Sequence, residues 1–222
     1  MTGSFGGAAA VEPTPSIAAP PTHITARRAP AALSNQPTRD GHDPSVPPPG
    51  DPRSVGTPDA LVIQFDAHLD LYNLADCKEE LNHGNFLRHA EALPQVVNVG
   101  HRDLFLPDAA VREFYRAHVP AAELAIDPAP AVAALGEWGA GAERVLLDID
   151  CDVFDPAYFP AVAHPQPLGL SPALLVKLVH AAWSDRVCGV ALSEFDPGRD
   201  RDDQSLGTLV WLLEYLLLKR YE

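Results

Sequence analysis

Short apolar runs alternate with segments of helical periodicity along residues 59–222. The short runs are rich in β-branched residues and predict buried strands, at 60–65, 95–99, 144–149 and 186–192. Apolar positions at helical spacing predict helices, at 85–93, from 107 through 115, at 130–138, from 171 through 179 and at 204–221. This alternation is typical of a three-layer α-β-α fold, in which helices cover a mostly parallel sheet.

The first 58 residues have a different composition. They contain 12 of the 23 prolines, and their acidic and basic residues balance. Proline lacks a backbone N–H group, and such a segment can bury little apolar surface, so we predict that residues 1–58 are mostly disordered. A targeting segment or an incorrect gene start would give a similar composition. Residues 59–222 then form the folded domain.

The charge of the chain limits its partners. Sixteen Lys and Arg residues stand against 30 Asp and Glu residues, a formal net charge of −14, which disfavours nucleic acid and anionic membranes as partners. The longest apolar run, 206–218, contains Glu214 and is shorter than the roughly 20 residues that cross a bilayer. Three cysteines without a C-x-x-C motif are typical of a reducing compartment, so we predict a cytoplasmic protein.

Carboxylates follow three of the predicted strands. Residues 66–70 read D-A-H-L-D, and alternate positions of an extended chain project to one side, so Asp66, His68 and Asp70 can converge. Asp150 and Asp152 follow the strand at 144–149 in the same spacing, and Ser193 and Glu194 follow the strand at 186–192. Parallel strands that neighbour one another would bring these acids together at one edge of the sheet.

A divalent metal ion is the simplest compensation for such a cluster. Carboxylates gathered in a water-poor cleft without a counter-charge would be forced to take up protons. Carboxylate oxygens with one imidazole suit Mn²⁺, with Fe²⁺, Co²⁺, Ni²⁺ and Zn²⁺ as alternatives, and shared carboxylates would hold two ions. Asp155 and Asp196 precede prolines and are predicted to be turn residues. Cys151, between two predicted ligands, should point into the core.

These motifs resemble those of the arginase/ureohydrolase superfamily. That family carries D-A-H-x-D, S-x-D-x-D-x-x-D-P and E-x-x-P after three strands, and the counterparts are residues 66–70, 148–156 and 194–197. The resemblance covers residues 60–220 in order and includes His83-Gly84, Val99 to Arg102 and Gly169 to Ser171. It implies an arginase-like α/β fold in which the first strands are lacking or altered.

The resemblance also implies roles for individual residues. Asp66 and Asp150 would bridge two Mn²⁺ ions, His68 and Asp152 would complete one site, and Asp70 would belong to the other. His42, in D-G-H-D at 40–43, is the counterpart of a family histidine that completes a metal site. His83 would relay a proton, and Glu194 would pair with a guanidinium or amidine group.

The implied activity is hydrolysis of a C–N bond through a metal-bridging hydroxide, in a linear guanidino, amidino or related amide substrate. The partner would be a small cationic molecule, and homo-oligomerisation stays open. Two alternatives remain. One is a degenerate, metal-binding relative without catalysis. The other is a deacetylase-type amidohydrolase, although such enzymes use one Zn²⁺ and a histidine pair, and the sequence has no adjacent histidines.

Overall fold

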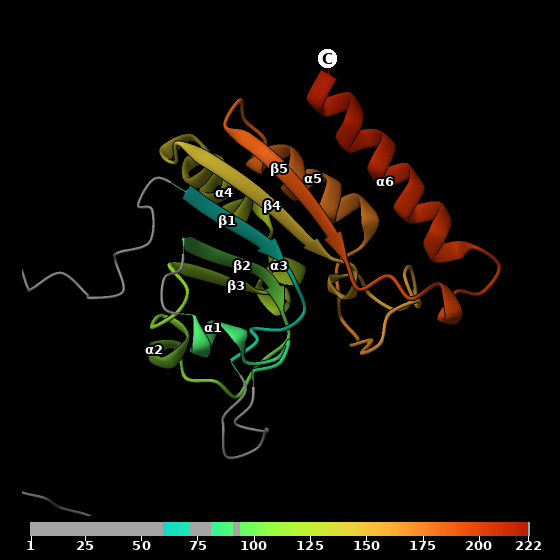
Figure 1. The fold of residues 1–222 in the computed structure, drawn as a ribbon, viewed down its shortest axis with the longest axis horizontal. Helices are drawn as coiled ribbons and strands as arrows, with labels where there is room; N and C mark the ends of the chain where they lie inside the picture. Colours follow the sequence, from blue (N-terminus) through green and yellow to red (C-terminus); the bar gives the residue numbers. More distant parts are fainter. Residues whose placement is uncertain (1–59, 72–80, 91–93, 222) are drawn as a thin grey trace, which may run out of the picture. The chain divides into compact units, whose positions relative to one another are not determined.

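The computed structural model describes residues 60–71, 81–90 and 94–221. The predicted disordered segment 1–58 and the predicted ligand His42 lie outside the described residues. Within the described residues, five strands form one parallel sheet in the order β3-β2-β1-β4-β5 (Figure 1). The strands are β1 (Ala60–Phe65), β2 (Gln95–His101), β3 (Ala117–Pro120), β4 (Arg144–Asp150) and β5 (Val187–Ser193). The helices are α1 (Phe86–His89), α2 (Asp108–Val111), α3 (Ala121–Ile126), α4 (Ala129–Gly141), α5 (Pro172–Ala182) and α6 (Gln204–Tyr221).

Helices lie on both faces of this sheet, which confirms the predicted fold class. Successive residues of a strand face opposite sides, and Val97 and Val96 of β2 belong to two different apolar clusters. The cluster of Val97 includes Leu135 of α4 and Leu175 of α5, which cover one face (Figure 1). The cluster of Val96 contains side chains of α1, α2 and the segment that follows α2.

The segment after α2 departs from the prediction. A helix was expected from 107 through 115, but α2 ends at Val111, and the chain then enters β3, which the apolar pattern did not predict. Tyr115 explains the change, because it is 1% exposed and its hydroxyl donates to the carbonyl of Leu69 at 2.8 Å. This bond satisfies the buried hydroxyl, and the N–H of Arg116 donates to the carbonyl of Val96 in β2 at 2.8 Å, which places the chain beside that strand.

Other element ends agree more closely with the sequence. Ser171 caps α5, since its hydroxyl accepts a hydrogen bond from the Leu174 N–H at 3.2 Å, and Pro172 follows at the first helical position. The expected helix at 85–93 is shorter, because the backbone at Ala90 is extended. No described helix combines the length and the apolar character needed to cross a membrane.

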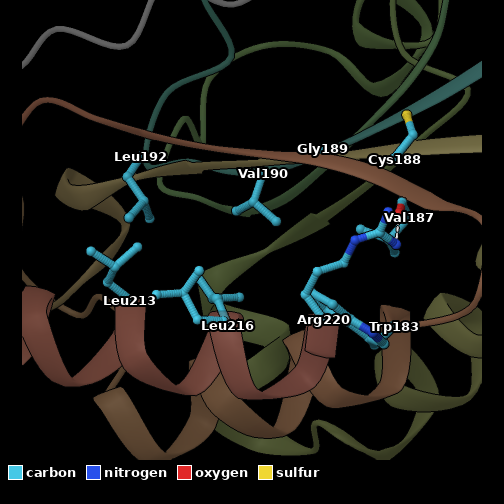
Figure 2. A pocket seen from close by; sticks show the side chains of 10 residues that line it. Trp183, Val187, Cys188, Gly189, Val190, Leu192, Leu213, Leu216 and Arg220 are labelled. Atoms are coloured by element: carbon cyan, nitrogen blue, oxygen red, sulfur yellow. Dashed lines mark hydrogen bonds between the residues drawn. The ribbon is translucent and has the colours of Figure 1, made fainter. Parts of the chain in front are cut away.

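An apolar cavity of about 210 Å³ lies between β5 and α6 (Figure 2). Side chains of Val190, Leu192, Leu213 and Leu216 line it, with Arg220 at one end. The described residues that line this cavity include no cluster of acidic or histidine side chains.

Candidate metal centre

The carboxyl ends of β1, β4 and β5 are neighbours in the sheet, so the acidic residues that follow these strands meet. They enclose a small polar cavity of about 70 Å³. Five carboxylates and three imidazoles line it: Asp66, Asp70, Asp150, Asp152, Glu194, His68, His83 and His164. All seven site residues that the sequence predicted within the described part of the chain are in this group. Their roles as ligands and catalytic groups stay predictions.

Backbone N–H groups orient the carboxylates in the two aspartate motifs. Asp66 accepts a hydrogen bond from the His68 N–H at 2.7 Å, and Asp150 accepts one from the Asp152 N–H at 2.9 Å. Asp152 in turn accepts from the Ala67 N–H at 3.1 Å, which ties the turn after β4 to the turn after β1. Each motif therefore orients its first acid locally, and the hydrogen bond from Ala67 to Asp152 joins the two motifs.

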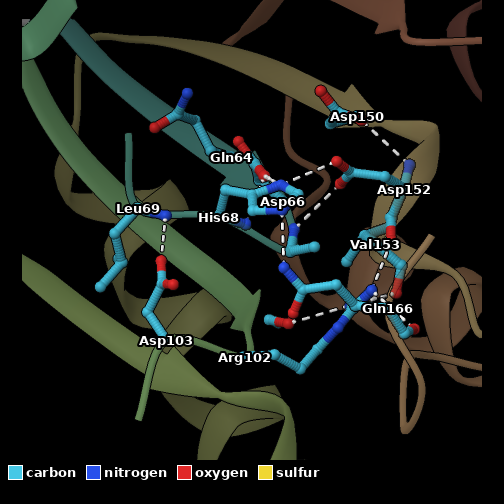
Figure 3. Close-up of polar contacts among 12 residues, drawn as sticks. Gln64, Asp66, His68, Leu69, Arg102, Asp103, Asp150, Asp152, Val153 and Gln166 are labelled. Carbon is cyan, nitrogen blue, oxygen red and sulfur yellow. Dashed lines mark hydrogen bonds and ion pairs between the residues drawn. The ribbon is translucent and has the colours of Figure 1, made fainter. Parts of the chain in front are cut away.

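Three of these side chains form a group suited to one metal ion. Asp66, His68 and Asp152 each offer a ligand atom, and the three atoms lie within 4.8 Å of one another. His68 Nδ1 is 2.8 Å from an oxygen of Asp152 and 3.8 Å from an oxygen of Asp66 (Figure 3). Asp66 and Asp152 are 6% exposed, so bulk water screens their charges poorly.

Burial and nearby negative charges raise the pKa values of three aspartates in the cavity. Desolvation, with Asp150 and Asp152 nearby, raises the pKa of Asp66 well above its usual value. Desolvation raises the pKa of Asp70 to about 6, and desolvation with the charge of Asp152 raises the pKa of Asp150 to about 8. No Lys or Arg lies among the described residues that line the cavity. A divalent cation would relieve this repulsion, so the donor set fits the predicted metal.

His68 and Asp152 behave as a pair. Burial lowers the pKa of His68, but the hydrogen bond and charge of Asp152 outweigh burial, and the pKa is raised. Burial raises the pKa of Asp152, but the hydrogen bond and charge of His68, together with the hydrogen bond from the Ala67 N–H, outweigh burial, and the pKa is lowered. Asp152 therefore differs from Asp66, Asp70 and Asp150, whose pKa values are raised.

The outer part of the cavity carries Glu194 and two histidines. Glu194 follows β5 in the left-handed region, at φ 61°. The rings of His83 and His164 are nearly parallel, with centroids 6.3 Å apart and an angle of 9° between their planes. His164 was not predicted as a site residue. It lies in the long connection between β4 and α5, whose path no local pattern of the sequence could give.

Other predicted side chains take structural roles. Asp155 and Asp196 accept hydrogen bonds from the N–H groups of Ala157 and Gly198, both at 2.9 Å, which is the expected turn role. Cys151 is fully buried, as predicted. The Nε2 atom of His101 lies 3.0 Å from Nδ1 of His118, and neither of these residues lines the acidic cavity.

Arg102 holds the turn that carries Asp152. Its guanidinium donates to the carbonyl of Asp152 at 2.6 Å and to that of Val153 at 2.9 Å. Gly100, two residues earlier, has φ 113°, and a Cβ atom there would lie 2.6 Å from the Val153 side chain. In the G-x-R stretch at the end of β2, Gly100 thus allows the Val153 side chain to approach closely, and Arg102 fixes the turn that carries Asp152. The sequence motif signalled this stretch but not its role.

Comparisons with known proteins show which family the chain belongs to. A model of the arginase family matches residues 52–218. The chain belongs to the arginase family. It is 30% identical over 152 residues to "Arginase 1, mitochondrial" of Arabidopsis thaliana, covering 64% of this chain and 42% of that protein.

Solved structures share the fold. A hypothetical agmatinase from Burkholderia thailandensis is 26% identical with a TM-score of 0.59, over 73% of this chain and 50% of that chain. Formimidoylglutamase from Bacillus subtilis is 21% identical with a TM-score of 0.61, over 72% and 53% of the two chains. This arginase-family chain therefore spans about half the length of the relatives it matches, and the resemblance seen in its motifs is confirmed.

Proposed function

We propose that this chain carries the metal centre of a ureohydrolase that cleaves a C–N bond of a linear guanidino, amidino or related amide substrate. One observation carries the proposal: the acidic residues after three neighbouring strands line a single cavity whose described lining has no Lys or Arg. Membership of the arginase family supports the same reaction class. The names of the relatives differ, so the substrate is proposed only by chemical class.

The proposed metal ligands divide into two sets. Asp66, His68 and Asp152 would hold one ion, as their mutual proximity suggests. Asp70 would hold a second, with Asp66 and Asp150 shared between the two, and His42 stays a further predicted ligand. Mn²⁺ suits this donor set best, with Fe²⁺, Co²⁺, Ni²⁺ and Zn²⁺ as alternatives. When bound, such ions make a water-derived nucleophile available at neutral pH and polarise the substrate.

Residues of the chain would orient the substrate and move the proton. Glu194 can accept two hydrogen bonds from a planar cationic head group at the mouth of the cavity. This contact would hold the substrate at the cavity that Asp66 and Asp150 also line. The imidazole of His83, which lines the same cavity, would deliver a proton to the departing amine.

Glu194→Gln tests this arrangement. The substitution keeps the size and shape of the side chain but removes the charge that faces the substrate cation. We expect Mn²⁺ affinity to change little and kcat/KM for the best guanidino or amidino substrate to fall about 100-fold, because a hydrogen bond to a charged group contributes about 1.5–3 kcal/mol. Urea and ammonia release across a set of such compounds provides the measurement.

Asp196→Asn is the matched control. It neutralises a carboxylate two residues away that bonds Gly198 and Arg199 instead of facing the cavity. Its turnover should stay near that of the unsubstituted chain. Full retention of turnover in Glu194→Gln would show that Glu194 does not recognise the substrate. Acetate release with one Zn²⁺ would favour the deacetylase alternative, and bound metal without any turnover would favour a non-catalytic relative.

A further inference from the structure

The His68 ring is held from both sides. Its Nδ1 atom faces the carboxylates of Asp152 and Asp66, at 2.8 Å and 3.8 Å. Its Nε2 atom lies 2.6 Å from the side-chain amide of Gln166 (Figure 3). The two nitrogens of this imidazole therefore have different partners. The carboxylate partners face Nδ1, which is the side of the proposed ion.

A carboxamide is well suited to the outer nitrogen. An imidazole that binds a metal ion through one nitrogen carries hydrogen on the other, and a polar neighbour usually holds that N–H. The amide group of Gln166 presents a donor at one end and an acceptor at the other, and half a turn about its last side-chain bond exchanges them. Gln166 can thus donate to a bare Nε2 or accept from Nε2–H without leaving its position.

Hydrogen bonds through Arg102 connect the backbone of Gln166 to the turn that carries Asp152. The Gln166 carbonyl accepts a hydrogen bond from Arg102 Nη2 at 3.2 Å, and the same nitrogen donates to the carbonyl of Asp152 at 2.6 Å. One guanidinium thereby links the segment that carries Gln166 to the turn that carries Asp152 (Figure 3). These two hydrogen bonds of Arg102 therefore help to fix the distance from Gln166 to the proposed ligands.

We propose that Gln166 is a positioning residue that holds Nε2 of His68 and so presents Nδ1, and not Nε2, to the metal ion. The inference rests on the proposed metal centre. Gln166 itself binds no ion and touches no substrate. Without it, the ring can rotate about its Cβ–Cγ bond and offer either nitrogen to the carboxylate side.

Substitutions at Gln166 separate this role from a merely structural one. Gln166→Leu removes both hydrogen-bonding ends, and we expect Mn²⁺ affinity to fall about 10–100-fold, the usual cost of losing such an outer partner. Gln166→Glu retains an acceptor for Nε2–H and should bind Mn²⁺ at least as tightly as the unsubstituted chain. Leu168→Glu is the control for added charge, since Leu168 is 77% exposed on the same segment, and its affinity should stay near the unsubstituted value.

The decisive readout is the ring nitrogen spectrum of His68 in the full chain. With diamagnetic Zn²⁺ bound, ¹⁵N NMR should show hydrogen on Nε2 and the ion on Nδ1, and Gln166→Leu should show a mixture of the two orientations. Hydrogen on Nδ1 in the unsubstituted protein, or unchanged Mn²⁺ affinity in Gln166→Leu, would overturn the proposal.

Measurements on the protein in chelator separate a failure of the Gln166 proposal from a failure of the proposed function. If the protein bound neither Mn²⁺ nor Zn²⁺, the metal centre would fail, while the metal-free spectrum would still report the contact. A clear change of the Nε2 resonance in Gln166→Leu would then support Gln166 as the partner of His68. An unchanged Nε2 resonance would refute that partnership.

Discussion

Replacing Asp150 with Asn should weaken Mn²⁺ binding by at least about 100-fold, since the loss of an outer partner alone costs 10–100-fold and Asp150 is a proposed ligand shared by both ions. The substitution keeps the shape of the side chain, and an amide oxygen can still accept the hydrogen bond that Asp150 accepts from the Asp152 N–H. The loss would therefore report the missing charge and not a broken turn.

Calorimetric titration of the chelated chain with Mn²⁺ measures this effect. Asp155→Asn provides the control, because Asp155 bonds the N–H groups of Ala157 and Gly169 and does not line the cavity. Its affinity should match that of the unsubstituted chain. Equal Mn²⁺ affinity and stoichiometry in Asp150→Asn would remove Asp150 from the metal centre.

The metal-free protein should lose stability as the pH rises from 6.5 to 8. Burial raises the pKa of Asp66 and, to about 8, that of Asp150, so the folded chain binds protons that the unfolded chain has released. When the folded state binds more protons, the free energy of unfolding falls as pH rises. One such proton corresponds to about 1.4 kcal/mol per pH unit, so we expect a loss of about 2 kcal/mol over this range.

His101 has the opposite effect on the pH dependence of stability, but it acts mainly below pH 6.5. Burial, with His118 nearby, lowers the pKa of His101 to about 4, so below its ordinary pKa of about 6.5 the unfolded chain binds a proton that the folded chain does not. That difference destabilises the fold as pH falls from about 6.5 to 4. Above pH 6.5 His101 is largely neutral in both states and contributes little.

Thermal unfolding in chelator and in saturating Mn²⁺ tests the sign. In chelator the midpoint should fall from pH 6.5 to 8, and Asp150→Asn should be more stable than the unsubstituted chain at pH 8. With Mn²⁺ the trend should reverse, because protons compete with the ion for the same oxygens. A chelated protein whose stability is constant or rises over this range would contradict the raised pKa values.

Four of the five described strands, and the acidic residues that follow three of them, could be predicted because their signals are local. A run such as residues 60–65, which is apolar except for Gln64, is buried or half-buried on both faces, and the motif at 66–70 follows it directly. Because these strands are parallel and neighbour one another, Asp66, Asp150 and Glu194 meet at the carboxyl edge of the sheet. No long-range information beyond the fold class is needed.

Residues whose roles could not be predicted from the sequence make contacts with residues far away in the chain. Gln166 meets His68 over a separation of 98 residues, and His164 reaches the cavity from the same long connection. Tyr115 ends the expected helix by bonding Leu69, 46 residues earlier. In each case the partner is set by tertiary packing, and the local pattern around the residue is ordinary.

Anomalous scattering at the manganese edge, from a crystal of the full chain grown with Mn²⁺, tests most directly whether divalent ions compensate the acidic cavity. The account predicts anomalous density among Asp66, His68, Asp150 and Asp152, with His68 coordinating through Nδ1. A well-ordered cavity with these side chains in place and no anomalous density, at saturating Mn²⁺, would contradict it.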